Sequence, residues 1–380
     1  MKIVHLCLSN YYIDDFLYQE NQLVRRHVAD GHDVSVIAST ETFDDKGEVV
    51  YGPPRSYMGF DGAPVIRLAY RRGLPSVLAR KVRAYPGVYR ILSNLAPNVV
   101  VCHGPAGWEL LTIARYVRDH PGVILHIDSH ADAFNSAQSW ASRHLLHGQF
   151  YRRILNRAMQ VSGPLLCVAP SVMDFAREVY CLPADRIEFF PLGGEVLPAA
   201  KREARRAATR ERLGITNEQI LIVQSGKQGR AKKLPQSLRA LAAVSDSRLR
   251  LAVAGLLQDD VRAEVEALMA QDTRVTFLGW QNPDQLTDLL CAADVYLQPG
   301  TQSATMQQAL CCGCAVILDD IVSHAPYSQE NGWFVDGEAA LLKALRAVPE
   351  ADLAAMQARS LDFARRVLDY SAMAERLLRP

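Results

Sequence analysis

The first candidate for chemistry is a cationic loop in the second half of the chain. In ILIVQSGKQGRAKKL an apolar run, 220–223, is followed by Gly226 and then by four cations, Lys227, Arg230, Lys232 and Lys233. A glycine-containing turn after a strand leaves backbone N–H groups free, and a diphosphate group needs such donors together with positive charge. The pattern therefore predicts a diphosphate site, with a solvated basic turn as the alternative interpretation.

The second candidate is a histidine-containing segment in the first half. VILHIDSHADAFNS begins with an apolar run that contains His126, and His130 lies just past that run, between two aspartates. Loops after strands often carry functional side chains, so His130 is the preferred catalytic candidate. A lone histidine is also often only a satisfied polar contact, and that alternative stays open. His103, which ends the apolar run of VVVCHGP, is a weaker candidate for the same region.

Both candidates lie within an alternation of short apolar runs and amphipathic stretches. The runs include KIVHLCLS, HDVSVIAS, NVVVCHG and LLCVAPS in the first half and RLRLAVAG, RVTFLGW, DVYLQPG and CAVILDD in the second. This alternation is typical of parallel sheets with covering helices. The fold class is therefore α/β, with two tandem Rossmann-like doubly wound domains. Such sheets bind ligands outside the carboxyl ends of their strands.

The length of 380 residues also favours two domains over one. A charged, alanine-rich segment at 201–212 is typical of a helix, and we place the domain junction just before it. We expect domains over 1–198 and 199–362, and a final helix over 363–380 that crosses back to the first domain.

Charge and composition exclude several classes of protein. Lys plus Arg (42) nearly balance Asp plus Glu (41), so no global field favours nucleic acid as a partner. No apolar run approaches the roughly 20 residues that span a bilayer, and MKIVHLCLS predicts a first strand instead of a signal peptide. The eight cysteines lack metal-ligand spacing. We expect a cytoplasmic protein.

The order of these segments resembles the retaining GT-B glycosyltransferases of family 4, over most of the chain. The resemblance implies two domains that face across a cleft, with the acceptor bound by the N-terminal domain and a nucleotide sugar by the C-terminal one. Lys227 and Lys232 match the spacing of the cations that hold the donor diphosphate in that family, which assigns them catalytic roles. Gly226 and Arg230 fall in the same donor-binding loop.

Two further segments match donor-binding parts of this family. In RVTFLGWQNPDQL, Trp280 and Gln281 occupy the place of the loop beside the nucleotide base, where an indole stacks well, although packing of Trp280 against the interdomain surface is an equal alternative. PGTQSATMQQALCCG occupies the place of a signature with two glutamates, and neither is present. The donor-binding candidates there are Thr301, Gln302, Ser303, Ala304, Thr305 and Gln308, with Gln308 at the second glutamate position.

The first half matches the acceptor side of the same family. SNYYIDDFLYQENQLVRRHVADGHDVSVIAS resembles its opening strand, flexible loop and acceptor-side helix, and VILHIDSHADAFNS resembles the stretch with its active-site histidine. His130 would then contact the donor sugar. Glu20 could equally be a first-turn carboxylate favoured by the helix dipole. The acceptor-binding candidates are Asn10, Tyr11, Tyr18, Glu20 and His103.

The function implied by the resemblance is transfer of a hexosyl group, with retention, from a nucleotide-diphosphate sugar to a glycan or a lipid-diphosphate-linked acceptor. Bacterial surface polysaccharide, such as lipopolysaccharide or capsule, is the associated product. No metal or other cofactor is expected, and no Asp-x-Asp motif is present. A nucleotide-sugar epimerase or a sugar phosphorylase of the same fold, and a non-catalytic protein that binds a nucleotide sugar or a glycan, remain alternatives. A dinucleotide-dependent oxidoreductase is less well supported, since no Gly-x-Gly-x-x-Gly follows either opening strand.

The stretch from Arg67 to Arg90 contains no acidic residue but seven cations interleaved with apolar side chains. This mixture favours peripheral contact with an anionic membrane, at its inner face. A solvated helix that pairs with acids from elsewhere is the alternative.

Overall fold

The apolar runs of this chain form the strands of two parallel sheets, one in each of two units. The computed structural model describes residues 1–44, 48–133 and 135–380. Unit 1 comprises Met1–Pro191 and Tyr370–Pro380, and unit 2 comprises Leu192–Asp369. The first junction precedes the predicted one because the segment 192–198 hydrogen-bonds within unit 2, where the N–H of Val196 donates to the carboxylate of Asp369.

Unit 1 contains an eight-stranded sheet in the order β10-β9-β8-β7-β1-β2-β6-β5. Its strands are β1 Lys2–Cys7, β2 Asp33–Ser39, β5 Arg55–Met58, β6 Pro64–Leu68, β7 Val99–His103, β8 Ile124–Ser129, β9 Leu165–Cys167 and β10 Ile187–Phe189. Only β5 pairs antiparallel, with β6. A separate antiparallel pair joins β3 Glu41–Phe43 to β4 Val49–Tyr51. The strand order reverses between β1 and β7, so a ligand site is expected where these two strands end.

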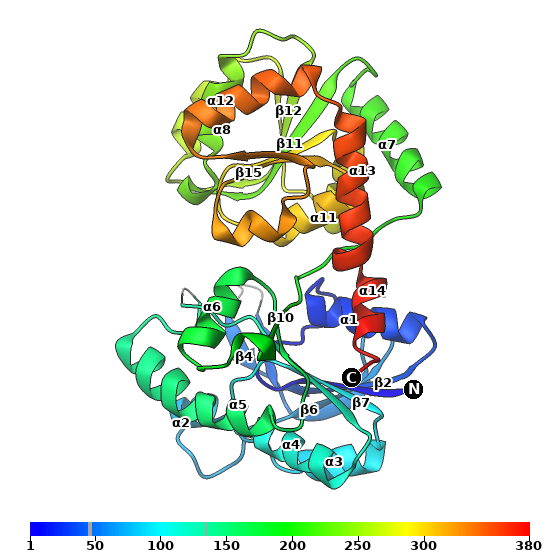
Figure 1. Ribbon diagram of the computed structural model, residues 1–380, viewed down its shortest axis with the longest axis vertical. Coiled ribbons are helices and arrows are strands. Elements are labelled where there is room, and N and C mark those ends of the chain that lie inside the picture. Colours follow the sequence, from blue (N-terminus) through cyan, green and yellow to red (C-terminus); the bar gives the residue numbers. More distant parts are fainter. Residues whose placement is uncertain (45–47, 134) are drawn as a thin grey trace. The chain divides into compact units, whose positions relative to one another are not determined.

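Helices cover both faces of this sheet. They are α1 Gln19–Ala29, α2 Ser76–Val82, α3 Val88–Leu95, α4 Glu109–Asp119, the π-helix η1 Ser142–Tyr151, α5 Arg152–Ala158, α6 Pro170–Glu178, the 3-10 turn η2 Ala184–Arg186 and α14 Tyr370–Arg376. Helices α3, α4 and α5 lie on one face, and α1 lies beside α14 on the other (Figure 1). Because both faces are covered, β1 and β7 are almost entirely buried and read as continuous apolar runs. Gly31, with φ +80°, takes the left-handed conformation that commonly follows the end of a helix, here α1.

Unit 2 contains a six-stranded, all-parallel sheet in the order β13-β12-β11-β14-β15-β16. Its strands are β11 Ile220–Gln228, β12 Leu249–Leu257, β13 Val275–Gly279, β14 Val295–Gln298, β15 Ala315–Asp319 and β16 Gly332–Val335. Its helices are α7 Ala199–Leu213, α8 Leu234–Ala242, α9 Arg262–Met269, α10 Pro283–Ala292, α11 Ala304–Cys312, α12 Gly337–Ala347 and α13 Leu353–Phe363. Shorter turns are η3 Arg230–Lys232, η4 Val322–Tyr327, η5 Val348–Glu350 and η6 Ala364–Leu368.

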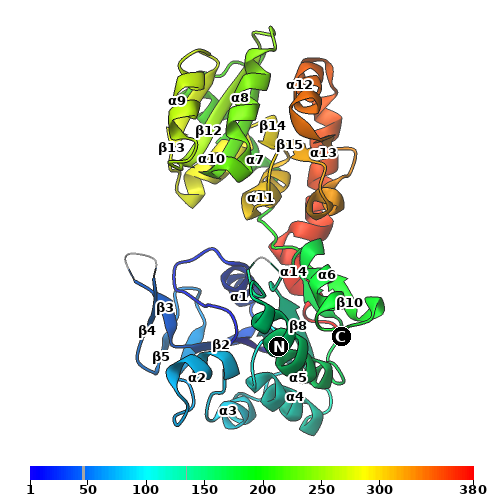
Figure 2. The ribbon, with the colours of Figure 1, turned by 90° about the vertical axis from the view of Figure 1, so that its left-hand side faces the viewer.

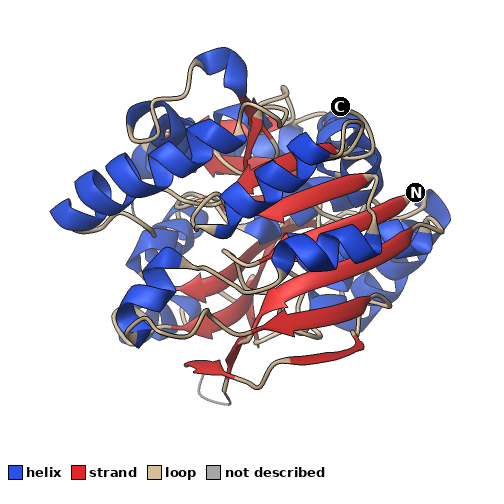
Figure 3. Ribbon diagram, turned by 90° about the horizontal axis from the view of Figure 1, so that it is seen from below, coloured by secondary structure: helices blue, strands red, loops and turns tan. Residues whose placement is uncertain are grey.

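In unit 2, helices α8, α9 and α12 cover one face of the sheet, and α7, α10, α11 and α13 cover the other (Figure 2). The strand order reverses between β11 and β14. In both units the strands are flanked by helices, as the colours of Figure 3 show. The predicted α/β class with two doubly wound halves is confirmed. Within the described residues, no helix combines the length and the apolar composition needed to cross a bilayer.

Candidate functional site

The predicted phosphate loop lies at the end of β11, beside the point where the strand order of unit 2 reverses. Gly226 and Lys227 belong to the strand itself, which continues to Gln228. Gly226 has φ +120° and pairs with Gly255 on β12, where an added Cβ would lie 1.9 Å from the carbonyl oxygen of Gly226. Glycine is therefore required at this close approach. The chain then enters η3 and α8.

Lys232 joins this loop to the loop that follows β14. Its Nζ donates to the carbonyl oxygen of Thr301 at 2.7 Å, and the N–H of Thr301 donates back to the carbonyl of Ala231 at 3.2 Å. An added Cβ on Gly300 would lie 2.1 Å from that same Ala231 oxygen, so only glycine fits. Burial lowers the pKa of Lys232 to about 8.

Two of the three neighbouring cations are paired, whereas Lys227 and Lys232 have no ion pair among the described residues. Lys233 forms an ion pair with Asp319 at 2.7 Å, and the Nε of Arg230 lies 3.8 Å from Asp260. Among the described residues, no carboxylate lies within 4.0 Å of the Lys232 ammonium. A partly buried ammonium without an acidic partner favours an anionic ligand at this position.

The amino end of α11 supplies further donors beside Thr301. Ser303 caps the helix, since its Oγ accepts the N–H of Met306 at 3.3 Å and donates to Gln298 at 2.7 Å. The N–H groups of Ala304 and Thr305, in the first turn, have no acceptor within the helix. Their dipoles add positive potential near Lys232. The side chain of Gln302 points elsewhere and donates to the hydroxyl of Tyr327 at 2.9 Å.

Gln308 does not have the free side chain that we expected of a ribose ligand. Its Oε1 accepts the N–H of Glu195 at 2.9 Å, and its Nε2 donates to the carbonyl of Glu195 at 3.1 Å. Gly194 passes so close that an added Cβ would lie 2.8 Å from Gln308 Oε1. The carboxamide therefore holds the segment 193–195 against α11, and the contact of Gln308 with a donor stays a prediction.

Trp280 and Gln281 follow β13, two strands away from β11 in the sheet. The Trp280 side chain is 63% exposed, so its ring face is available for stacking. Gln281 donates to the carbonyl of Leu278 at 2.8 Å, which fixes the turn beneath the indole.

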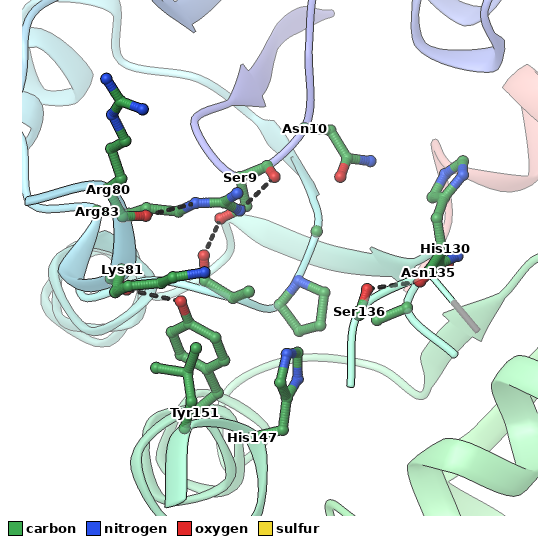
Figure 4. A pocket seen from close by; sticks show the side chains of 15 residues that line it. Ser9, Asn10, Arg80, Lys81, Arg83, His130, Asn135, Ser136, His147 and Tyr151 are labelled. Atoms are coloured by element: carbon green, nitrogen blue, oxygen red, sulfur yellow. Dashed lines mark hydrogen bonds between the residues drawn. The ribbon is translucent and has the colours of Figure 1, made fainter. Parts of the chain in front are cut away.

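Unit 1 contains a cavity of about 320 Å³ at the carboxyl ends of β1, β7 and β8 (Figure 4). This is the edge at which the order of strands reverses. Its lining comprises Ser9, Asn10, Arg80, Lys81, Arg83, Gly104, Pro105, Ala106, His130, Ala131, Asn135, Ser136, Leu146, His147 and Tyr151. This described lining carries three full cations and no carboxylate, which favours a ligand with negative charge.

The cationic wall of this cavity is held by hydrogen bonds to the backbone. Arg83 has φ +51° and donates to the carbonyl oxygens of Ser9 and, at 3.3 Å, Arg80. The hydroxyl of Tyr151 donates to the carbonyl of Lys81 at 2.6 Å. The Lys81 ammonium extends into the cavity in Figure 4 and has no ion-pair partner within the described part of the chain. Burial, followed by the charges of Arg83 and Lys81, lowers the pKa of His147 to about 4, so its ring is neutral at pH 7.

His130 lies at the opposite side of the cavity, close to two carboxylates. Its Nε2 lies 3.8 Å from Glu20 Oε1 and 3.8 Å from Asp128 Oδ1. Asn10 donates to Glu20 at 2.9 Å, and Asn135 donates to the carbonyl of His130 at 2.7 Å. The Nε2 of His130 is buried and has no hydrogen-bond partner among the described residues. Such an atom is expected to receive its partner from a ligand.

His103 is brought to the same region but cannot contact a ligand. It is fully buried, and its ring nitrogens are hydrogen-bonded to His5 and Asp128. The interpretation of His103 as a direct acceptor ligand does not fit this burial. Tyr11 and Tyr18 do not line the cavity and are exposed instead. They belong to an aromatic group whose ring centroids lie 5.1 to 6.3 Å apart: Tyr11, Phe16, Tyr18 and Phe43.

The basic stretch predicted to contact a membrane is divided between three environments: the interior of unit 1, the cavity lining, and the exposed surface, where Arg71, Arg72 and Arg90 lie. Arg67 is only 6% exposed and donates to the carbonyls of Tyr12 and Ser39, so it is excluded from any surface. Lys81 and Arg83 line the cavity. Sequence reasoning missed this cavity wall, since a run of cations on α2 does not reveal that the helix end turns toward β1. Asn135, Ser136, His147 and Tyr151 were missed because they carry no motif.

Comparisons with known proteins agree with this architecture. Residues 20–193 match the family described as Glycosyl transferase 4-like domain, and residues 205–357 match Glycosyl transferases group 1. The D-inositol 3-phosphate glycosyltransferase of Rhodococcus jostii (strain RHA1) is 26% identical over 276 residues. That match covers 69% of this chain, and it spans 58% of the relative's length.

Two solved structures illustrate the likeness in fold. The structure of the Anabaena protein HepE in complex with UDP has a TM-score of 0.63 and 13% identity, and covers 99% of this chain and 98% of that one. WaaG, described as a glycosyltransferase involved in lipopolysaccharide biosynthesis, has a TM-score of 0.59 and 19% identity, with coverage of 99% and 98%.

Proposed function

Because this chain belongs to the GT-B glycosyltransferases of the family 4 type, we propose that it transfers a sugar from a nucleotide-diphosphate sugar bound by unit 2 to an acceptor bound by unit 1. The observation that carries this proposal is the Lys232 ammonium, which lies beside the amino end of α11 and has no carboxylate partner among the described residues. Its charge and the N–H groups of Ala304 and Thr305 are suited to a diphosphate.

We propose retention of configuration, without a metal ion or other cofactor. Lys232, Lys227 and the first turn of α11 would stabilise the charge that develops on the leaving diphosphate. The leaving phosphate would then accept the proton of the acceptor hydroxyl on the same face of the sugar. No protein nucleophile is needed in this scheme, and His130 contacts the sugar being transferred. Bound UDP in the HepE structure makes UDP the first nucleotide to test.

The acceptor proposed for unit 1 carries a negatively charged group, such as a phosphate or a diphosphate. The support is the cavity wall of Arg80, Lys81 and Arg83, which faces a lining without a described carboxylate. The name of the Rhodococcus relative includes an inositol phosphate, and a lipid-diphosphate acceptor has the same chemistry. Phosphate oxygens would accept hydrogen bonds from Lys81 and from the N–H groups of Arg83 that the backbone leaves free.

Replacement of Lys81 by alanine is expected to raise the KM for a phosphorylated acceptor about tenfold, because one charge-assisted hydrogen bond is lost. The KM for the matched neutral acceptor and for the donor should change less than twofold. The first pair to compare is D-inositol 3-phosphate with inositol, followed by other phosphorylated and neutral sugars, with UDP-sugars as donors. Arg90→Ala, in the same basic stretch but outside the cavity lining, is the control. Equal losses for charged and neutral acceptors would contradict the anionic subsite.

A non-catalytic protein that binds a nucleotide sugar is the second candidate. Two observations favour it: both glutamates of the family signature are missing, and the Gln308 side chain is occupied by the backbone of Glu195. Donor turnover, as opposed to donor binding alone, separates the two functions.

We also propose that unit 1 contacts an anionic membrane, at its cytoplasmic face, during synthesis of a bacterial surface polysaccharide. Support comes from α2 and the turn before it, where Leu74, Val77 and Leu78 are exposed beside Arg71 and Arg72. Val77→Asp is expected to reduce co-sedimentation with phosphatidylglycerol vesicles severalfold, because it places a charge in the apolar contact. Retention of wild-type co-sedimentation by this variant, or equal binding to neutral phosphatidylcholine vesicles, would contradict the proposal.

A further inference from the structure

A chain of hydrogen-bonded side chains crosses the buried centre of unit 1 and ends beside His130. The carbonyl oxygen of Ala374 on α14 contacts His27 Nε2 at 3.0 Å, and His27 Nδ1 contacts His5 Nε2 at 3.0 Å. His5 Nδ1 contacts His103 Nε2 at 2.9 Å, and His103 Nδ1 is hydrogen-bonded to Asp128 Oδ2. All three histidines are 0% exposed. The chain thus links α14, α1, β1, β7 and β8, and Figure 1 shows α14 beside α1.

The two ends of this chain determine how many protons it contains. At one end a carbonyl oxygen can only accept a hydrogen bond, and at the other end a carboxylate can only accept. Four hydrogen bonds therefore need four protons, whereas three neutral imidazoles supply three. One additional proton must be present for every contact to be a hydrogen bond. With that proton, the positive charge in the chain balances the Asp128 carboxylate, and the buried network is neutral overall.

The additional proton is most stable on the ring nearest to Asp128, which is His103. Charges in a buried environment interact strongly over short distances, and an ion pair offsets the desolvation of both groups. Because the carbonyl oxygen of Ala374 can only accept, His27, His5 and His103 each donate from Nε2 to the preceding group in the chain. His27 and His5 are therefore neutral with the proton on Nε2, and His103 carries protons on both nitrogens.

The pKa directions agree with this assignment. Burial, and then the neighbouring histidines, lower the pKa of His5, and burial lowers that of His27 to about 4. Burial acts to lower the pKa of His103, but Asp128 and, to a smaller extent, Glu20 together raise it, so the pKa lies above its ordinary value. For Asp128, burial acts to raise the pKa, but His103, His130 and the N–H of Gly104 together lower it below its ordinary value. The other ionisable groups that face the chain are Glu20, Asp30, His32, His130 and the thiols of Cys7 and Cys102.

We infer that His103 is a positioning residue, an imidazolium held by His5, His27 and the Ala374 carbonyl, which neutralises Asp128 and fixes its carboxylate against His130. The Oδ1 of Asp128 accepts the N–H of Gly104 at 3.0 Å and lies 3.8 Å from His130 Nε2. Without the cation behind it, the carboxylate would either take up a proton or leave a buried charge without compensation beside the cavity. The chain therefore sets the electrostatic environment of His130 from the buried interior of unit 1.

The direct test is the protonation state of the rings, observed by NMR of histidine-¹⁵N-labelled protein at pH 7, with resonances assigned by single His→Gln variants. His103 is expected to show two protonated nitrogens, and His5 and His27 one proton each, on Nε2. A spectrum in which His103 is neutral, or in which His27 carries the second proton, would overturn the inference. This measurement uses the wild-type protein, so it decides the question even if a variant does not fold.

Two variants separate this role from packing alone. Glutamine can replace a neutral imidazole in the chain, since its amide donates at one end and accepts at the other, but it cannot carry the additional proton. His27→Gln should therefore leave kcat within about twofold, whereas His103→Gln should lower kcat about tenfold or more with unchanged donor binding. A purely structural role predicts similar losses for these two fully buried residues, and that outcome would overturn the inference.

The slope of stability against pH provides a readout that does not depend on the proposed transfer reaction. The folded pKa of His103 lies above the ordinary value of 6.5, so folded protein binds the additional proton more tightly than unfolded protein does. Its contribution is present below pH 6.5 and is lost as the pH rises through the folded pKa. The melting temperature of the wild type should therefore fall more steeply above pH 6.5 than that of His103→Gln. The kcat comparison rests on the proposed function, whereas the NMR and stability measurements do not. Failure of the proposed function can therefore be distinguished from failure of this inference.

Discussion

Replacing Lys232 by methionine is expected to weaken nucleoside-diphosphate binding about a hundredfold, which corresponds to the loss of a charge-assisted contact of about 2.7 kcal/mol. The reason is geometric. The ammonium lies between the end of β11 and the amino end of α11. It donates a hydrogen bond to the carbonyl oxygen of Thr301. Methionine keeps the length and the apolar stem of the side chain but removes the charge.

The measurement is isothermal titration calorimetry with UDP, ADP and GDP, and the melting temperature of each variant checks that it is folded. Lys343→Met is the matched control, because Lys343 is an exposed lysine on α12 of the same unit. It should bind the preferred nucleotide as the wild type does. Undiminished binding by Lys232→Met would mean that the phosphate loop is wrongly assigned, whatever the reaction of the protein is.

The same lysine predicts how nucleotide binding depends on pH. Burial lowers the pKa of Lys232 to about 8 in the free protein, so the ammonium is lost as the pH rises through that value. A bound diphosphate stabilises the ammonium, so binding should weaken above about pH 8 and should take up protons there. Calorimetry at pH 9 in buffers with different ionisation enthalpies measures this uptake. The uptake should disappear in Lys232→Met, and a dissociation constant that stays constant from pH 7 to 9.5 would contradict the assignment.

Replacing His130 by glutamine is expected to lower sugar transfer about a hundredfold to a thousandfold and to leave nucleotide binding unchanged. The imidazole Nε2 is buried without a described hydrogen-bond partner, at the edge of the cavity and 3.8 Å from each of two carboxylates, Glu20 and Asp128. An atom in this position is suited to contact a reacting sugar. Nucleotide binding should be unaffected, because the phosphate loop belongs to unit 2.

The assay is turnover of the donor that gives the largest thermal shift, with product identified by mass spectrometry. His144→Gln, an exposed histidine of the same unit that does not line the cavity, is the control and should retain turnover. If His130→Gln retains turnover within a few-fold of the wild type, the assignment of His130 as the catalytic residue is wrong. If no variant and no wild-type sample turns over any donor, the non-catalytic candidate is favoured.

The sequence by itself determined the elements and the local part of the phosphate site. Strands buried on both faces are mostly apolar, so β1, β7, β11 and β14 appear as predominantly apolar runs separated by amphipathic helices, although β1 and β7 also carry the buried His5 and His103. The turn from Gly226 to Lys232 is also predictable from the sequence, because its strand, glycine and cations are contiguous in the chain. The start of α11 is also local, because Ser303 caps a helix that begins at the next residue.

Only the tertiary structure decided which distant residues meet. His5, His27 and His103 form one chain because β1 lies next to β7 and α1 packs beside α14, and no periodicity in the sequence encodes that adjacency. Gln308 accepts a hydrogen bond from Glu195, more than a hundred positions away, a partner that the local motif does not indicate. Lys81 lines a cavity because the end of α2 meets loops that are far away in the sequence. Local sequence pattern specifies which face of an element is buried, whereas the partner of each polar group depends on strand order and on contacts between segments far apart in the chain.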